Sequence, residues 1–121
     1  MTQDTKAPPR LMPFSGADFQ PRFEYGEQAQ VTVATGSSDG SDLGTGFGRF
    51  SGADIPWTVQ YDEVLLVLDG ELTVETDAGR LTAGPKDSIW LPRGTALRYT
   101  ADNAMVFYAI TPANWADGDG S

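Results

Sequence analysis

Short apolar segments, separated by turn residues about every eight to twelve positions, recur along the chain from residue 30 onward. Val, Leu, Ile and Tyr dominate these segments, and such runs are typical of β-strands. No segment has a convincing helical period, apart from one turn near 112–117. The pattern predicts strands near 30–35, 43–50, 57–68, 71–76, 79–82, 88–91, 96–100 and 105–111. Many short strands in so short a chain indicate a sandwich, a jelly roll or a small barrel.

Turn residues mark the places where the chain reverses between these strands. Asp69-Gly70 fits the two central positions of a type I′ hairpin, both of which need a positive φ. Asp77-Ala78-Gly79 and Pro92-Arg93-Gly94 are two further tight turns. The stretch ATGSSDGSD, residues 34–42, is rich in Gly, Ser and Asp and predicts a loop.

The first thirty residues differ from the rest, because they combine several prolines with scattered aromatic side chains. We predict that residues 1–30 form an irregular N-terminal arm, that residues 31–115 form one β-domain, and that residues 116–121 form a flexible tail. The arm is expected to pack on the domain or on a partner subunit through the apolar side chains of Leu11, Phe14, Phe19 and Phe23.

The segment EVLLVL, residues 63–68, is apolar on both faces after its glutamate. A strand with one face in water would alternate apolar and polar residues. The outer face of this strand is therefore expected to be covered, either by the N-terminal arm or by a second subunit. We expect a homodimer that forms through this sheet.

Composition narrows the possible functions. The 121-residue chain has no His and no Cys, which removes disulfides, thiol chemistry, the commonest metal ligand and the usual proton shuttle at neutral pH. A formal net charge of -9 argues against nucleic acid or an anionic membrane surface as partner. The N-terminus lacks the apolar segment of a signal peptide, and no apolar run approaches the roughly 20 residues of a membrane helix. We therefore expect a cytoplasmic protein.

One stretch, PWTVQYDEVLLVLDGELTV at residues 56–74, resembles the first motif of the cupin family of small β-barrels. Glu63 and Gly70 are separated by the six residues that this motif requires. Trp57 and Val59 stand where the motif usually carries its two histidines. The usual metal ligands are therefore missing from a motif that is otherwise recognisable.

The second cupin motif is also present without its histidine. Pro92-Arg93-Gly94 is followed by Leu97 at the histidine position, and Lys86-Asp87 stands where the family usually has Gly-Asp. The resemblance implies an all-β, single-domain cupin fold, which is an RmlC-like jelly-roll β-barrel.

Four pieces of the chain resemble, more narrowly, the cupin domain of the EutQ family of ethanolamine utilization proteins. They lie within residues 43–115 and read LGTGFGRF, the motif at 56–74, AGPKDSIWLPRGTALRY and FYAITPANW. This resemblance implies a cytoplasmic protein of ethanolamine catabolism, associated with a protein-shelled microcompartment, in a family described as having acetate kinase activity. A broader histidine-poor cupin group, related to ureidoglycine aminohydrolases, is the competing assignment.

The cupin motif glutamate points into the barrel, which places Glu63 inside. Because side chains alternate along a strand, Trp57 and Tyr61 are expected on the same inward face. The predicted ligand-binding residues are Trp57, Tyr61, Glu63, Leu97, Tyr99 and Tyr108, with Glu63 as the candidate catalytic residue. The alternative is that the aromatic residues are ordinary core and that Glu63 is a structural carboxylate, hydrogen-bonded by Tyr61 or Tyr99.

An aromatic cavity with one carboxylate suits a small polar or cationic ligand, such as an aminoalcohol. One inward Glu offers too few oxygen ligands for a metal, so we expect no transition metal and no other cofactor. The apolar alternation of residues 43–50 indicates a strand rather than a phosphate loop. Four further cations are interpreted as solvated rather than as an anion site: Arg80, Lys86, Arg93 and Arg98.

Two functions from different classes remain open. The first is a binding or auxiliary protein of amine or aminoalcohol metabolism, whose barrel captures a small molecule without chemistry. The second is an enzyme, with either the acetate kinase activity described for the family or acid/base catalysis by Glu63 and a tyrosine.

Overall fold

The computed structural model describes residues 6–22 and 25–115 of the chain. Phe23 of the predicted arm and the predicted tail at 116–121 lie outside the described residues. Within the described ranges, no helix has the length and apolar character needed to cross a membrane. The elements are β1 (Gln20–Pro21), β2 (Ala29–Val31), the 3-10 turn η2 (Ser37–Asp39), β3 (Gly44–Thr58), β4 (Asp62–Gly70), β5 (Leu72–Thr76), β6 (Gly79–Ala83), β7 (Ser88–Leu91) and β8 (Ala96–Thr111).

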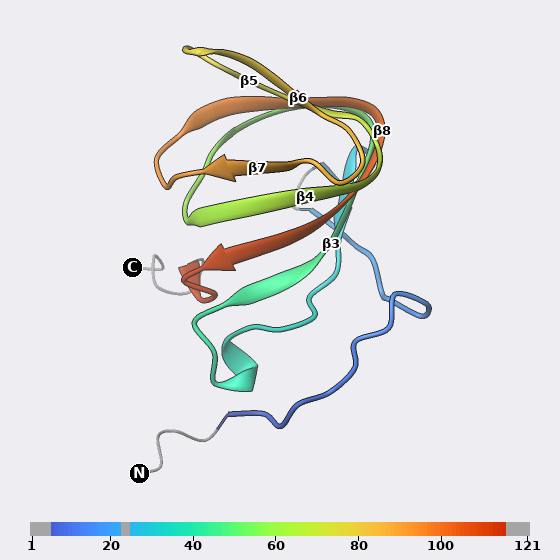
Figure 1. Ribbon diagram of the computed structural model, residues 1–121, viewed down its shortest axis with the longest axis vertical. Helices are drawn as coiled ribbons and strands as arrows, with labels where there is room; N and C mark the ends of the chain where they lie inside the picture. The colour runs from blue at the N-terminus through green and yellow to red at the C-terminus, as the bar shows by residue number, and fades with distance from the viewer. Residues whose placement is uncertain (1–5, 23–24, 116–121) are drawn as a thin grey trace.

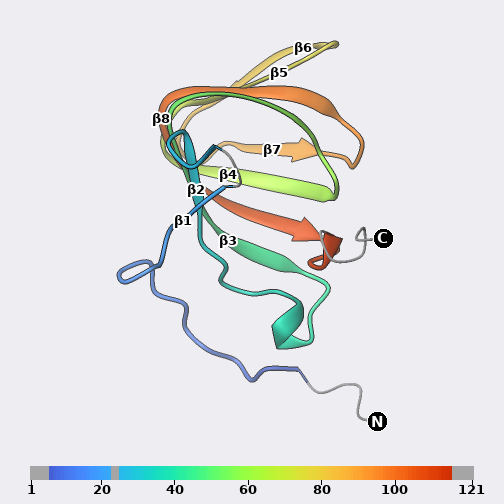
Figure 2. The same cartoon turned by 180° about the vertical axis from the view of Figure 1, so that it is seen from behind.

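The strands form one antiparallel sheet that curls into a barrel (Figure 1). Its order is β1-β2-β3-β8-β4-β7, and the hairpin of β5 and β6 pairs with the first half of β8. The long strand β8 pairs with β3 over its whole length, and its second half pairs with β4. Seen from behind, β1 and β2 extend the sheet beside β3 (Figure 2). The predicted all-β, single-domain barrel is confirmed.

Strands β3 and β8 bend together at Gly52 and Asp102, and this bend changes which positions face the interior. Gly52 has a φ of 52°, and the register between the two strands skips both residues. Before the bend, β3 buries even-numbered positions such as Phe50, and after it odd-numbered positions such as Ile55. The change of phase occurs in β8 as well. The predicted strands 96–100 and 105–111 are therefore one strand, β8, because a bend looks like a boundary in the hydrophobic pattern. The predicted strand 57–68 is wrong, since β3 ends at Thr58 and β4 begins at Asp62.

The predicted hairpin at Asp69-Gly70 is wrong. Gly70 has the expected positive φ of 75°, but it ends β4 while still paired with Ala104 of β8. The next strand, β5, pairs with β6 and β8 rather than with β4. A Cβ atom on Gly70 would lie 2.1 Å from the Asn103 carbonyl oxygen, so a close crossing over β8 requires this glycine. The turns predicted at 77–79 and 92–94 are confirmed.

The N-terminal arm packs on the outer face of β3 and β8. The Phe14 ring meets Phe47 edge-on, with 4.9 Å between the ring centroids, and Phe47 contacts Phe107 at 5.5 Å. Residues 20–21 of the arm pair with β2 and are therefore part of the sheet, not irregular.

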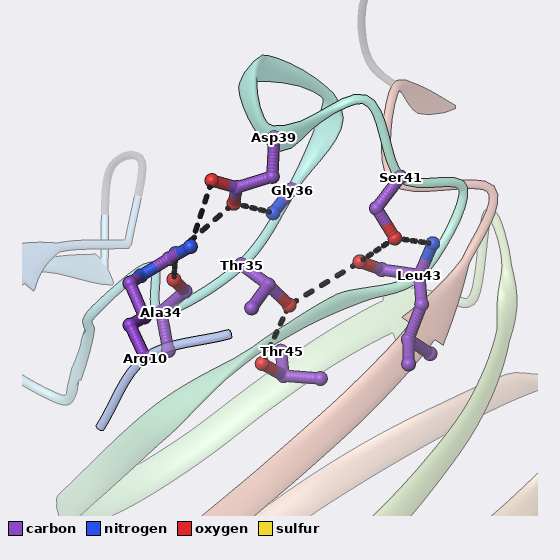
Figure 3. A network of polar contacts seen from close by, with 8 residues as sticks. All are labelled: Arg10, Ala34, Thr35, Gly36, Asp39, Ser41, Leu43 and Thr45. Atoms are coloured by element: carbon purple, nitrogen blue, oxygen red, sulfur yellow. Dashed lines mark hydrogen bonds and ion pairs between the residues drawn. The ribbon is translucent and has the colours of Figure 1, made fainter. Parts of the chain in front are cut away.

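Arg10 binds the arm to the loop between β2 and β3 through polar contacts, as Figure 3 shows. Its Nη1 lies 3.1 Å from Asp39 Oδ1, and its Nη2 donates a hydrogen bond of 2.6 Å to the Ala34 carbonyl. Asp39 also accepts a hydrogen bond of 3.0 Å from the Gly36 amide. The hydrogen bond from Arg10 lowers the pKa of the Asp39 carboxyl. These contacts restrain a loop that borders the interior of the barrel.

The outer face of β4 and β7 remains exposed within the described part of the chain. Val64 is 42% exposed, Leu68 43% and Trp90 59%. Val64 and Trp90 are direct neighbours across the two strands. The arm therefore covers the sheet over β3 and β8, and an apolar surface of β4 and β7 is left beside it.

Candidate functional site

A cavity of about 330 Å³ lies inside the barrel and is the candidate site. Its wall comes from β2, β3, β4 and β8, from the loop at 33–38, and from residues 113 and 115. Ser37 and Ser38 are exposed, so the cavity reaches the solvent beside this loop. Much of the wall is apolar, and its larger side chains include Phe50, Ile55, Leu65, Val106 and Ile110.

Glu63 is the one carboxylate among the described residues that line the cavity, and it is only 6% exposed. The Tyr99 hydroxyl donates a long hydrogen bond of 3.3 Å to Glu63 Oε1. Burial raises the pKa of Glu63 to about 7, against the opposing effects of the nearby Arg22 charge and of the Tyr99 hydrogen bond. Of the two tyrosines proposed from the sequence, Tyr99 therefore makes the bond. Glu63 can exchange a proton near neutral pH.

Arg22 is a site residue that the sequence did not reveal. It follows β1 at the end of the arm, and its Nη2 donates a hydrogen bond of 2.9 Å to the Tyr61 hydroxyl. Its guanidinium carbon lies 5.0 Å from the centre of the Trp57 ring, which is a cation–π contact. Burial raises the pKa of Tyr61, and the charge of Arg22 opposes this rise. The arm thus supplies a positive charge to the cavity. Glu63 is the carboxylate of the wall whose pKa this charge lowers.

Tyr108, on β8, belongs to the cavity wall. Its hydroxyl donates a hydrogen bond of 2.6 Å to the Thr32 carbonyl. Burial raises the pKa of Tyr108 to about 12, so its hydroxyl stays protonated at neutral pH. Gly46 lies directly beside this bond, because a Cβ atom there would be 2.7 Å from the Tyr108 hydroxyl oxygen.

Aromatic rings from distant segments complete the wall. Trp115, in the turn after β8, meets Tyr61 at 5.0 Å and Trp57 at 6.0 Å between ring centroids. Trp115 was not predicted as a site residue. It lies in the Pro-Ala-Asn-Trp piece that carried the family resemblance, and this piece was the one sequence feature that could have indicated its position in the site. Trp57 and Tyr61 line the cavity, and Tyr61 also belongs to the buried core against which Trp57 packs.

Leu97 is the predicted site residue that the cavity wall does not include. It is buried and is the register neighbour of Trp57, but it belongs to the hydrophobic core. Trp57, its neighbour on β3, does line the cavity. The other five predicted ligand-binding residues all line the cavity.

The charged residues that the sequence assigned to solvent lie away from the cavity. Arg98 forms an ion pair with Asp54 on the surface. Asp62 accepts a hydrogen bond of 2.9 Å from the Arg93 amide, so it points toward the turn that contains Arg93. None of the four cations interpreted as solvated is among the described residues of the cavity wall: Arg80, Lys86, Arg93 and Arg98.

The residues present do not fit the metal centre that the cupin fold usually holds. Trp57, Val59 and Leu97 occupy the three histidine positions, and none of these side chains is a metal ligand. Among residues 6–22 and 25–115, no group of three or more Asp, Glu, His or Cys side chains could hold a metal ion. We assign no step of chemistry to a metal.

Comparison with known sequences identifies relatives of the chain. The family model for the ethanolamine utilisation protein EutQ matches residues 13–117. The acetate kinase EutQ of Escherichia coli K12 is 36% identical over 97 residues, which cover 78% of this chain and 42% of that protein. The acetate kinase EutQ of Clostridioides difficile 630 is 32% identical over 75 residues, covering 61% and 48%. The chain therefore spans less than half the length of the curated relatives it matches.

Solved structures agree with these sequence matches. A putative ethanolamine utilization protein Q from Salmonella typhimurium LT2 superposes with a TM-score of 0.80 at 27% identity, over 86% of each chain. An RmlC-like cupin from Shewanella frigidimarina superposes with a TM-score of 0.71 over 89% of this chain and 95% of its own, at 14% identity, and so supports the fold alone. The chain has the cupin fold and belongs to the EutQ family of ethanolamine utilisation proteins.

Proposed function

We propose that the barrel of this EutQ-family protein binds a small polar molecule, and that Glu63 is the group that hydrogen-bonds to it or exchanges a proton with it. The observation that carries the proposal is a buried carboxylate that faces a cavity of about 330 Å³. A mostly apolar wall with a few convergent polar groups is the usual form of a small-molecule site. A structural carboxylate would need a hydrogen-bond partner but no empty space beside it.

The proposed role is that of an auxiliary binding protein in ethanolamine or amine metabolism. An aminoalcohol ligand stays a prediction, and the charge of Arg22 would oppose its ammonium group. Cytoplasmic location and association with a microcompartment, which the family resemblance implies, also stay predictions.

A second candidate is the activity named in the relatives, acetate kinase, at 36% identity. Phosphoryl transfer needs backbone amides, cations and Mg²⁺ around the phosphates. The described wall contains two arginines, Arg22 and Arg49, and the guanidinium carbon of Arg49 lies 4.0 Å from the centre of the Phe19 ring in the arm. Residues 44–50 lie within β3, so this glycine-rich segment is a strand and not a phosphate loop. Binding is therefore our main proposal.

The two candidates can be separated with purified protein. We expect no ATP from acetyl phosphate, ADP and Mg²⁺ above the protein-free reaction. In a panel of small carboxylates, amines and alcohols, at least one compound is expected to raise the Tm of the wild type, and Glu63→Gln to reduce that rise. Glu71→Gln, an exposed glutamate outside the cavity, is the matched control and keeps the wild-type response. Turnover that Glu63→Gln abolishes in a folded protein would instead establish the enzyme.

We also propose that two copies associate through the outer face of β4 and β7, where Val64, Leu68 and Trp90 are exposed. Burying such a surface against its own copy removes apolar area from water. The wild type is expected to sediment as a dimer in analytical ultracentrifugation and Trp90→Glu as a monomer. Leu81→Glu changes an equally exposed apolar residue on β6, and it is expected to remain dimeric. A monomeric wild type at the highest concentration measured contradicts this proposal.

A further inference from the structure

The cavity is larger than ethanolamine or acetate, the two small molecules in the names of the family and its relatives. Its volume of about 330 Å³ falls in the range of about 300–1,000 Å³ in which sites enclose drug-sized ligands. Acetate and ethanolamine each have two carbon atoms and would leave most of this volume to water. Because much of the remaining wall is apolar, water there would lack hydrogen-bond partners. The cavity therefore fits a longer molecule with an apolar body.

Four polar side chains of the wall form one cluster, and the wall also includes the polar side chains of Gln30, Arg49 and Tyr108. Tyr61, directly before β4, and Glu63, within it, are two positions apart and both buried. Arg22 donates a hydrogen bond to Tyr61, and Tyr99 donates one to Glu63. A ligand can therefore place a single polar group at this cluster and its apolar part against the rest of the wall.

The cluster is rich in hydrogen-bond donors and favours a negative ligand group. Arg22 is a permanent cation with five N–H donors, and one of them donates to the Tyr61 hydroxyl. Burial raises the pKa of Glu63 to about 7, so part of it is protonated at neutral pH and can donate a hydrogen bond to a ligand oxygen. An ammonium ligand would also find the Trp57 ring already in a cation–π contact with Arg22.

From this geometry we propose that the cavity binds a monocarboxylate with an apolar body, whose carboxylate meets Arg22 and whose body lies against Leu65, Val106 and Ile110. The inference rests on the proposed binding function and specifies its ligand class. A carboxylate and a guanidinium form charge-assisted hydrogen bonds, which are the strong ones inside proteins. Arg22 is then the residue that selects the charge of the ligand.

Calorimetric titration with acetate, butanoate, hexanoate and octanoate tests the proposal. Affinity is expected to rise by about fourfold for each added methylene until the cavity is full, because each buried methylene contributes about 0.8 kcal/mol. Hexanoate is expected to bind more tightly than hexylamine. Arg22→Gln is expected to weaken octanoate binding by at least about tenfold and to leave octanol binding unchanged. Arg80→Gln is the control, because Arg80 pairs with Glu75 on the surface and lies outside the cavity wall, and it is expected to retain octanoate binding.

Two further variants control for binding at the outer surface and for a variant that does not fold. Leu81→Glu changes an exposed apolar side chain on β6, outside the cavity, and is expected to keep full octanoate affinity, which excludes binding to this part of the outer surface. Arg22→Lys keeps the positive charge and is expected to keep the preference for hexanoate over hexylamine. If Arg22→Gln does not fold, Arg22→Lys and the charge series on the wild type decide the question.

The outcomes distinguish this inference from the function on which it rests. Tighter binding of hexylamine than of hexanoate, or affinity that is independent of chain length, overturns the carboxylate class while the binding function stands. If the folded wild type binds no carboxylate, amine or alcohol at all, the binding function itself fails. Octanoate affinity that survives Arg22→Gln unchanged shows that Arg22 does not select the ligand.

Discussion

As the pH rises from about 4 to about 8, the free energy of unfolding of Glu63→Gln is expected to increase by about 3 kcal/mol relative to that of the wild type. Burial raises the pKa of Glu63 from an ordinary value of 4.5 to about 7. The folded state therefore keeps a proton that the unfolded state releases. The stability from protonated Glu63 is fully present below about pH 4.5 and is lost as the pH rises through about 7. One pKa unit corresponds to about 1.4 kcal/mol, and Gln has no such proton to lose.

Urea unfolding of both proteins across this pH range measures the difference directly. Asp62→Asn is the control, because Asp62 is adjacent in sequence but accepts its hydrogen bond from the Arg93 amide, away from the cavity. This control is expected to leave the contribution of Glu63 in place. Parallel pH profiles for the wild type and Glu63→Gln would mean that Glu63 is as well solvated in the folded protein as in the unfolded one.

The second large effect is expected at Gly46, where replacement by Ala should lower the free energy of unfolding by more than about 3 kcal/mol. A Cβ atom there would lie 2.0 Å from the Thr32 carbonyl oxygen, which also accepts the Tyr108 hydrogen bond. Thr32 cannot move aside easily, because its amide donates to the Phe47 carbonyl and its hydroxyl accepts from the Phe47 amide, both at 2.9 Å. Total stabilities of small domains are about 5–15 kcal/mol, so the variant is expected to be close to unfolding.

Gly48→Ala is the matched control in the same strand and on the same face. Its Cβ atom would meet the Val106 Cγ2 atom at 3.1 Å, and a side-chain methyl can shift by a few tenths of an ångström. We expect a change of less than about 1 kcal/mol for this variant. Thermal and urea unfolding of both variants compare the two effects. Equal stabilities would show that the chain around Thr32 can retreat from β3.

Local patterns were sufficient for most of the strands and for part of the site. Alternation placed Trp57, Tyr61 and Glu63 on one inward face. All three line the cavity, although Trp57 belongs to β3, Glu63 to β4 and Tyr61 to the turn between them. It failed at the bend of β3 and β8, where both strands change phase and separate predicted strands are one. Tyr108 lies after that bend, where β8 turns its even-numbered positions to the interior.

The sequence by itself determined the all-β class, the cupin motif and the inward position of Glu63, since these rest on local period and on motif spacing. Tertiary structure decided what surrounds that carboxylate. Arg22 reaches Tyr61 across 39 residues, and Tyr108 reaches the Thr32 carbonyl across 76. No local pattern records which distant segments a curled sheet brings together. The charge of the cavity, and with it the class of ligand that we propose, therefore depended on where the arm returns to the barrel.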